Sequence, residues 1–203
     1  YTTMEDTLRT FIAIELPETV IAALRKVQAR FQTYRFKMRW VKAENIHLTL
    51  KFLGDIRAGD VRQVQQAVTE GVAGCDPFNL QAKGIGVFPG VKRARVLWAG
   101  LSGDTRRLVE LQQAIDSRLA EIGIEREKKK YTGHLTLGRS KGRIDPRQLV
   151  DAMQQNGGFV SEPFTVDRAV LFQSRLKPDG AVYTRLHTVN LQPDLMKIRS
   201  IDS

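Results

Sequence analysis

One tetrapeptide stands twice in this chain. His-Leu-Thr-Leu occupies residues 47–50 and again residues 134–137, and each copy lies in an apolar, strand-like run. Side chains of a β-strand alternate between its two faces, so the histidine and threonine of each copy share one face and the leucines share the other. The leucines can be buried while the histidine and threonine face open space. The repeat therefore predicts two related strands with the same burial pattern.

Helical and strand-like runs interleave along the whole chain, and the second half repeats the plan of the first. Short turns join several strand pairs, which is typical of antiparallel hairpins. The pattern predicts an α+β fold rather than a doubly wound parallel sheet. No Pro/Ser-rich linker divides the chain, so we expect one domain over residues 1–203. The expected helices are 17–34, 60–72, 104–122 and 146–155, and the expected strands are 7–16, 38–41, 46–53, 78–88, 94–101, 134–139, 164–174 and 181–191.

The balance of charge indicates a polyanionic partner. There are 32 Lys and Arg against 22 Asp and Glu, a formal net charge of +10. Such an excess favours nucleic acid or an acidic membrane surface, although a basic surface with no such partner remains an alternative. No long basic amphipathic helix is present, which weakens the membrane interpretation. No apolar run approaches the length of a membrane span. The single cysteine, Cys75, cannot form an internal disulfide, which fits a cytoplasmic location.

Two imidazoles and two hydroxyls around one point suit phosphodiester chemistry. A neutral imidazole can accept a proton from an attacking hydroxyl, and an imidazolium can donate one to the leaving oxygen. The hydroxyls of Thr49 and Thr136 can donate to the non-bridging phosphate oxygens, where charge builds up in the transition state. A single His-x-Thr would be ordinary, because such residues occur in strands without any functional role. Two copies indicate that His47 and His134 are a catalytic pair.

These residues resemble the 2H phosphoesterase superfamily, which is named for two His-x-Thr motifs. The closer resemblance is to the RNA 2',3'-cyclic phosphodiesterases, also called 2'-5' RNA ligases, and it covers nearly the whole chain. The segments that carry it are residues 9–17 (RTFIAIELP), 39–41 (RWV), 47–54 (HLTLKFLG), 87–89 (VFP), 96–100 (VLWAG) and 134–139 (HLTLGR).

The resemblance implies two pseudo-symmetric lobes, each an antiparallel sheet with helices outside, and an active-site cleft between them. It implies hydrolysis of RNA 2',3'-cyclic phosphate ends to 2'-phosphates and a reversible, ATP-independent 2'-5' ligation. By the same resemblance His134 is the general base and His47 the general acid. Many relatives have proline before the second histidine, where this chain has Gly133. We expect a monomer that needs neither metal nor cofactor.

Further residues have two interpretations each. Arg139 would lie on the face opposite His134 in a regular strand, but a bulge would bring it to the phosphate. Tyr131 and Phe52 can stack on a base or pack in the core. Trp40, Trp98 and His187 are expected to be structural.

One short motif resembles a catalytic signature but is expected to be a turn, and two functions other than the one above remain open. Residues 177–180 (KPDG) match a nucleotidyl-transfer signature, but they lie between two strands and predict a tight turn. The alternatives to the proposed activity are a non-catalytic RNA-binding module and a phosphodiesterase for another cyclic nucleotide.

Overall fold

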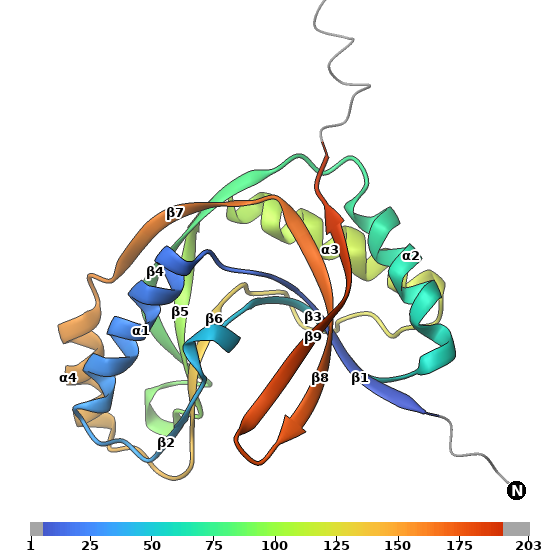
Figure 1. Ribbon diagram of the computed structural model, residues 1–203. Helices are drawn as coiled ribbons and strands as arrows, with labels where there is room; N and C mark the ends of the chain where they lie inside the picture. Colours follow the sequence, from blue (N-terminus) through green and yellow to red (C-terminus); the bar gives the residue numbers. More distant parts are fainter. Residues whose placement is uncertain (1–5, 193–203) are drawn as a thin grey trace, which may run out of the picture.

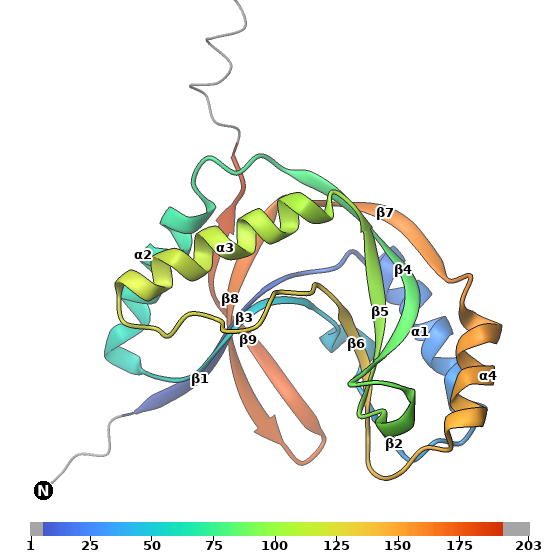
Figure 2. The same ribbon diagram turned by 180° about the vertical axis from the view of Figure 1, so that it is seen from behind.

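The computed structural model describes residues 6–192, which form two antiparallel sheets arranged as an arch (Figures 1 and 2). This confirms the predicted α+β class. The four-stranded sheet has the order β3 (Leu48–Arg57), β1 (Thr7–Ile14), β8 (Arg168–Lys177) and β9 (Gly180–Asn190). The five-stranded sheet has the order β2 (Met38–Trp40), β6 (Leu135–Ser140), β5 (Val96–Gly103), β4 (Phe78–Phe88) and β7 (Val160–Val166).

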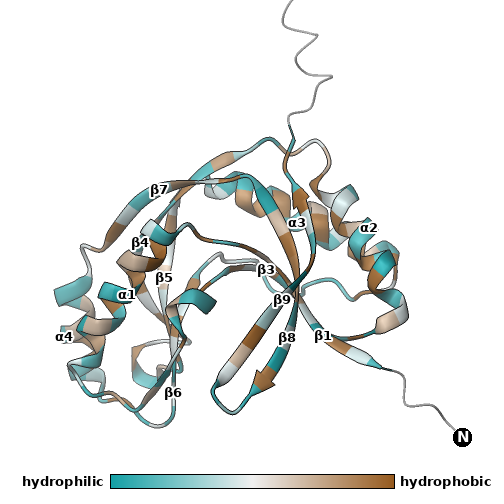
Figure 3. Ribbon diagram, viewed as in Figure 1, coloured by the Kyte–Doolittle hydropathy of each residue, from teal (hydrophilic) through white to brown (hydrophobic). Residues whose placement is uncertain are grey.

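Each sheet is covered on its outer face by two helices. Helices α2 (Val61–Val72) and α3 (Thr105–Glu121) pack on each other and on the four-stranded sheet, whereas α1 (Glu18–Gln32) and α4 (Pro146–Asn156) pack against the five-stranded sheet. The helices are amphipathic, as Figure 3 shows, because their apolar residues recur at helical spacing and so share one face. The main core therefore lies between helices and sheets. A second, smaller buried cluster lies on the inner face of the four-stranded sheet and consists of Phe11, Ala13, Val170 and Phe172.

The helix ends follow the local sequence. Asp145 caps α4, since its carboxylate accepts hydrogen bonds from the backbone N–H groups of Arg147 and Gln148, and Pro146 occupies the first turn. Gly123 follows α3 with φ +88°, a conformation that glycine adopts without a steric penalty. These two signals, read from the sequence, are confirmed.

The chain passes back and forth between the two sheets. β1 belongs to the four-stranded sheet, but α1, which follows it, packs against the five-stranded one. Strands β2 and β3 are consecutive and lie in different sheets, as do β7 and β8. Neither sheet is built from one half of the chain alone.

The single strand predicted over residues 164–174 is wrong. β7 ends at Val166 and β8 begins at Arg168, and the two strands belong to different sheets. Apolar residues continue across the break, because Phe164 and Val166 are buried on one sheet and Ala169 and the residues after it on the other. A change of hydrogen-bonding partner leaves no mark on the hydrophobic pattern, so the sequence could not reveal it.

Candidate active site

The two histidines are held in the same way. The Nδ1 of His47 lies 2.8 Å from the carbonyl oxygen of Asn45, and the Nδ1 of His134 lies 2.8 Å from the carbonyl oxygen of Thr132. A carbonyl can only accept, so each Nδ1 carries the proton and each neutral ring keeps its Nε2 lone pair. The repeat in sequence is thus a repeat in geometry, with Nε2 as the reactive atom of both imidazoles.

A β-bulge follows each motif at the same position. In the pairing of β1 with β3, Ala13 lies opposite Thr49 and Ile12 opposite Lys51, which leaves Leu50 as the extra residue. In the pairing of β5 with β6, Trp98 lies opposite Thr136 and Leu97 opposite Gly138, which leaves Leu137 as the extra residue.

An extra residue reverses the alternation of side chains beyond it. Phe52 therefore lies on the same side as Thr49, and Arg139 on the same side as Thr136, and all four line one cavity. The expectation that Arg139 faces away in a regular strand does not hold, because β6 is bulged at Leu137. The fifth residue after each histidine is thereby turned into the cavity.

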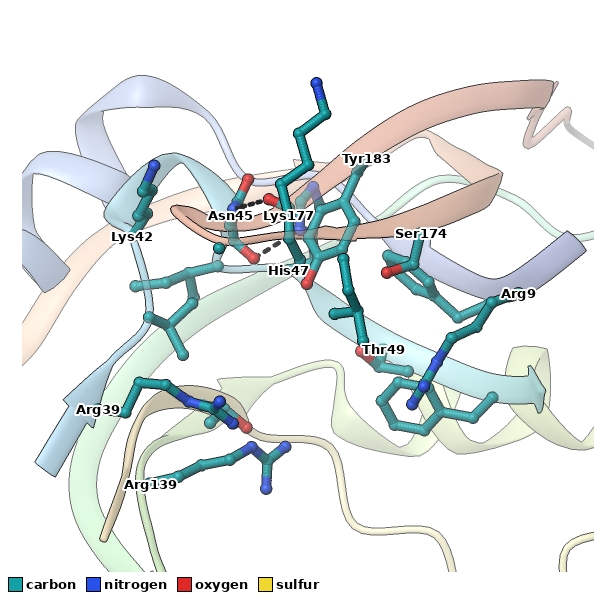
Figure 4. Close-up of a pocket in the computed structure, with 18 of the residues that line it drawn as sticks. Arg9, Arg39, Lys42, Asn45, His47, Thr49, Arg139, Ser174, Lys177 and Tyr183 are labelled. Carbon is teal, nitrogen blue, oxygen red and sulfur yellow. Dashed lines mark hydrogen bonds between the residues drawn. The ribbon is translucent and has the colours of Figure 1, made fainter. Parts of the chain in front are cut away.

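The cavity has a volume of about 830 Å³ and lies between the inner faces of the two sheets (Figure 4). His47 and Thr49 contribute from the side of the four-stranded sheet, and Thr136 and Arg139 from the five-stranded sheet. His134 precedes β6 and is not part of the cavity lining found among the described residues. Its ring contacts that of Trp98, the cross-strand neighbour of Thr136, which puts it on the same face of the sheet.

Cationic side chains dominate the charged groups of the lining. In Figure 4, Arg39 and Arg139 extend into the cavity from one wall and Arg9 from another. Arg39 and Arg139 are direct cross-strand partners, a like-charge placement that destabilises a sheet unless an anion lies nearby. Among the residues described, none of the lining cations forms an ion pair. The charged residues of the lining are Arg9, Arg39, Lys42, Arg139, Lys177 and Asp179.

An aromatic cluster surrounds His47. Its ring centroid lies 4.9 Å from that of Phe172, 5.4 Å from that of Tyr183 and 6.2 Å from that of Phe11. Burial in this cluster lowers the pKa of His47, and the hydrogen bond to the Asn45 carbonyl opposes the shift only in part. The free protein therefore favours the neutral imidazole at this position.

His134 sits against a second aromatic group, with Phe88 at 5.0 Å and Trp98 at 6.3 Å between ring centroids. The preceding Gly133 is closely packed, because a Cβ there would lie 2.7 Å from Cδ2 of Leu108. Glycine at this position thus makes room for the core behind the motif.

The sequence profile described as LigT-like phosphoesterase matches residues 14–98 and 100–183, stretches that carry one motif each. The chain belongs to this family. It is 31% identical over 176 residues to an RNA 2',3'-cyclic phosphodiesterase of Methanocaldococcus jannaschii, covering 87% of this chain and 96% of that protein. It is 29% identical over 184 residues to the protein of the same name from Methanothermobacter thermautotrophicus, covering 91% and 99%.

Solved structures agree with the fold. Protein TT0787 of Thermus thermophilus superposes with a TM-score of 0.76 at 27% identity, over 92% of this chain and 100% of that one. Escherichia coli LigT in complex with 3'-AMP superposes with a TM-score of 0.69 at 26% identity, over 92% and 99%. The predicted family and its two-sheet architecture are confirmed.

Tyr131 takes a different place from the one expected of a base-stacking residue. Its hydroxyl donates to the backbone carbonyl of Thr49 at 3.0 Å, and the ring packs against the core. Burial raises its pKa, so it remains a protonated donor. In the described part of the chain Tyr131 is not among the cavity's lining residues, whereas Phe52 is, with a side chain 70% exposed.

Two other minor predictions have clear outcomes. His187 on β9 contacts Thr69 of α2, with 3.0 Å between Nε2 and Oγ1, in keeping with a structural role. Residues 177–180 form the turn between β8 and β9, although Lys177 lines the cavity.

Sequence reasoning missed several lining residues. Arg9 on β1 and Tyr183 on β9 are far along the chain from either motif, and both line the cavity. Burial raises the pKa of Tyr183, and the nearby guanidinium groups of Arg139 and Arg9 act in the opposite direction. Trp40 lines the cavity and Trp98 touches His134, so both do more than pack the core. Arg9 and Phe11 lie two residues apart on β1 and both line the cavity, so strand periodicity is the signal that could have placed Arg9 there.

Among residues 6–192, no group of three or more His, Cys, Asp or Glu side chains is placed to hold a metal ion. No helix in this part of the chain is long and apolar enough to cross a membrane.

Proposed function

We propose that this phosphoesterase hydrolyses 2',3'-cyclic phosphates at RNA ends to 2'-phosphates. The observation that carries the proposal is the pair of histidines held with Nε2 free, with their partner threonines on opposite walls of one basic cavity. The names of the relatives support the same substrate class.

In the proposed reaction a water molecule attacks phosphorus on the side opposite the ribose 3'-oxygen. His134 Nε2 takes the proton of the water as the new P–O bond forms. His47, as imidazolium, gives a proton to the 3'-oxygen as its bond to phosphorus breaks. A 5'-hydroxyl of a second RNA, in place of water, would form a 2'-5' linkage without ATP.

The remaining groups have separate tasks in this proposal. Thr49, Thr136 and Arg139 donate hydrogen bonds to the non-bridging oxygens, which carry the growing negative charge. Phe52 offers an exposed ring for the terminal base, the role considered earlier for both Phe52 and Tyr131. Arg9, Arg39 and the other cations of the lining attract the polyanionic substrate.

The lowered pKa of His47 bears on the choice of acid and base. A general acid must be protonated, and burial among aromatic rings opposes protonation in the free protein. The negative charge of a bound phosphodiester acts the other way. With His47 as acid, kcat/KM falls as pH rises through a pKa below 6.5; with His47 as base, kcat/KM rises through the same pKa.

The roles can be separated with a phosphodiester that has an aryloxide leaving group, which needs little protonation. H47A should recover much of its lost rate on this substrate, and H134A should not. Recovery by H134A instead would invert the assignment and keep the two-histidine mechanism.

The activity is tested with an oligonucleotide that ends in a 2',3'-cyclic phosphate, followed by identification of the product isomer. The expected product is the 2'-phosphate. H47A and H134A should each lose at least about 100-fold in rate, while H187A, as the matched control, should lose far less. Near wild-type turnover by either active-site variant would refute the mechanism.

Binding and turnover assays on the same purified protein distinguish the alternative functions. Tight RNA binding with no turnover would favour a non-catalytic RNA-binding module. Turnover of cyclic mononucleotides but not of RNA ends would favour a phosphodiesterase for another cyclic nucleotide.

A further inference from the structure

We propose that Lys51, Asp116 and Tyr131 form a latch that holds residues 125–131 against the first motif strand and so positions His134. The inference rests on the proposed function, because it assigns positioning residues to that reaction. None of the three side chains lines the cavity among the described residues, so they act through the backbone of the segment they hold.

The first half of the latch is a buried ion pair. Lys51 and Asp116 are 6% and 8% exposed, and the Lys51 ammonium donates to the Asp116 carboxylate. The same ammonium donates to the carbonyl oxygen of Glu125 at 2.7 Å, and the Asp116 carboxylate lies 3.4 Å from the backbone nitrogen of Glu127. Both Lys51 and Asp116 therefore also form hydrogen bonds with the backbone of residues 125–127.

The second half of the latch is the Tyr131 hydroxyl. It donates to the carbonyl oxygen of Thr49, two residues before Lys51 on the same strand. Because burial raises the pKa of Tyr131, its hydroxyl keeps its proton at neutral pH and remains a donor. The segment is thus fastened to β3 at both of its ends.

The held segment leads directly to the second histidine. Residues 125–134 contain no helix or strand and connect α3, on the four-stranded sheet, to β6 in the five-stranded sheet. The Thr132 carbonyl that accepts from His134 Nδ1 comes one residue after Tyr131. Fixing Tyr131 on Thr49 therefore fixes the acceptor that orients His134 and ties its position to the opposite motif.

Stability alone does not account for the ion pair. Replacing a buried pair with well-packed apolar residues is often neutral or stabilising, because two charges no longer lose their hydration. What apolar residues cannot supply is direction, since they would leave the Glu125 carbonyl and the Glu127 N–H without these partners. The pair is better explained by the geometry it imposes on the segment.

The test uses two variants that leave no buried charge unpaired. K51M/D116L removes both charges together, so no buried charge is left unpaired, and Y131F removes one hydroxyl. We expect kcat on a cyclic-phosphate RNA end to fall about 10- to 100-fold, as for a displacement of a reacting group by about 1 Å, with KM changed less than about twofold. The matched control is R106A/E110A, an exposed ion pair on the same helix α3, which should leave both constants unchanged.

A second readout does not depend on activity. Ring-nitrogen NMR of the free protein reports the tautomer of each histidine. The latch variants should reduce the Nδ1–H tautomer of His134 and leave His47 unchanged as an internal reference.

An unchanged His134 signal in both variants, or equal changes in His47 and His134, would overturn the latch. Failure of the wild-type protein to turn over RNA ends would instead count against the proposed function, and the NMR comparison would still decide the latch.

Discussion

Replacing Gln28 with methionine tests whether the bulge after the second motif is maintained from behind. Gln28 lies on α1, is 5% exposed, and its Nε2 donates to the carbonyl oxygens of Val41 at 2.7 Å and Leu137 at 2.9 Å. Leu137 is the extra residue of the bulge, and its carbonyl also accepts from the Val41 N–H at 3.0 Å. Methionine has a similar length but no donor.

The expected loss of folding free energy in Q28M follows from the hydrogen bonds that Gln28 makes. Q28M leaves the half-buried Val41 carbonyl without this donor, which costs about 1–3 kcal/mol, and removes one of two donors from the Leu137 carbonyl, which costs about 1 kcal/mol. The total, about 2–4 kcal/mol, corresponds to a fall in Tm of roughly 5–15 °C for a chain of this length. Relaxation of the bulge would turn Arg139 out of the cavity, so KM should rise as well.

The assay is thermal unfolding followed by steady-state kinetics below the Tm. Q66M is the matched control, because Gln66 is exposed on α2 and its amide contacts only the Glu70 side chain among the bonds found for it; its effect should stay within about 0.5 kcal/mol. An unchanged Tm in Q28M would refute the energetic reasoning. A lower Tm with unchanged KM and kcat would refute the connection between the bulge and the site.

Three other predictions address the site itself. Since burial lowers the pKa of His47 below the value of about 6.5 in the unfolded chain, the folded state binds fewer protons between these two values. Stability should therefore be fully present above pH 6.5 and decline as pH falls through that window, and urea unfolding of H47N should lose this component; an identical pH dependence would contradict it. T49V and T136V should each lose about 1–3 kcal/mol of transition-state stabilisation in kcat/KM, and unchanged kinetics in both would mean that the hydroxyls do not touch the phosphate. Rising salt should weaken the binding of long RNA more than that of a cyclic mononucleotide, as measured by inhibition of turnover, and equal responses would show that the basic lining does not hold RNA.

Local sequence patterns were sufficient for most of the elements and for the repeated placement of the two histidines. Strand alternation placed each histidine with its threonine, and capping residues marked the ends of α3 and α4. The repeated motif was informative because packing does not require two histidines at equivalent positions. These features depend on residues close together in the chain.

Features that depend on pairing between distant segments could not be predicted from the sequence. The bulge at Leu137 turns Arg139 into the cavity, and the change of sheet after Val166 divides one apolar run into two strands. For Tyr131 the sequence left base stacking and core packing open, and the structure has its hydroxyl bonded to Thr49, a residue of the other motif. In each case the partner strand, not the local composition, decides where the side chain points.

The repeated passage of the chain between the two sheets has a mechanical consequence. Enzymes that close around a substrate by hinge motion connect their moving parts through a few residues that absorb the rotation. Here the connections after β1, β2, α2, β5, α3 and β7 all run from one sheet or its helices to the other. Rotating one sheet against the other would strain all of these connections at once. We therefore expect the spacing between the two motif strands to be nearly constant through turnover, and adjustment to different RNA ends to come from side chains and from the projecting turn between β8 and β9 (Figure 1).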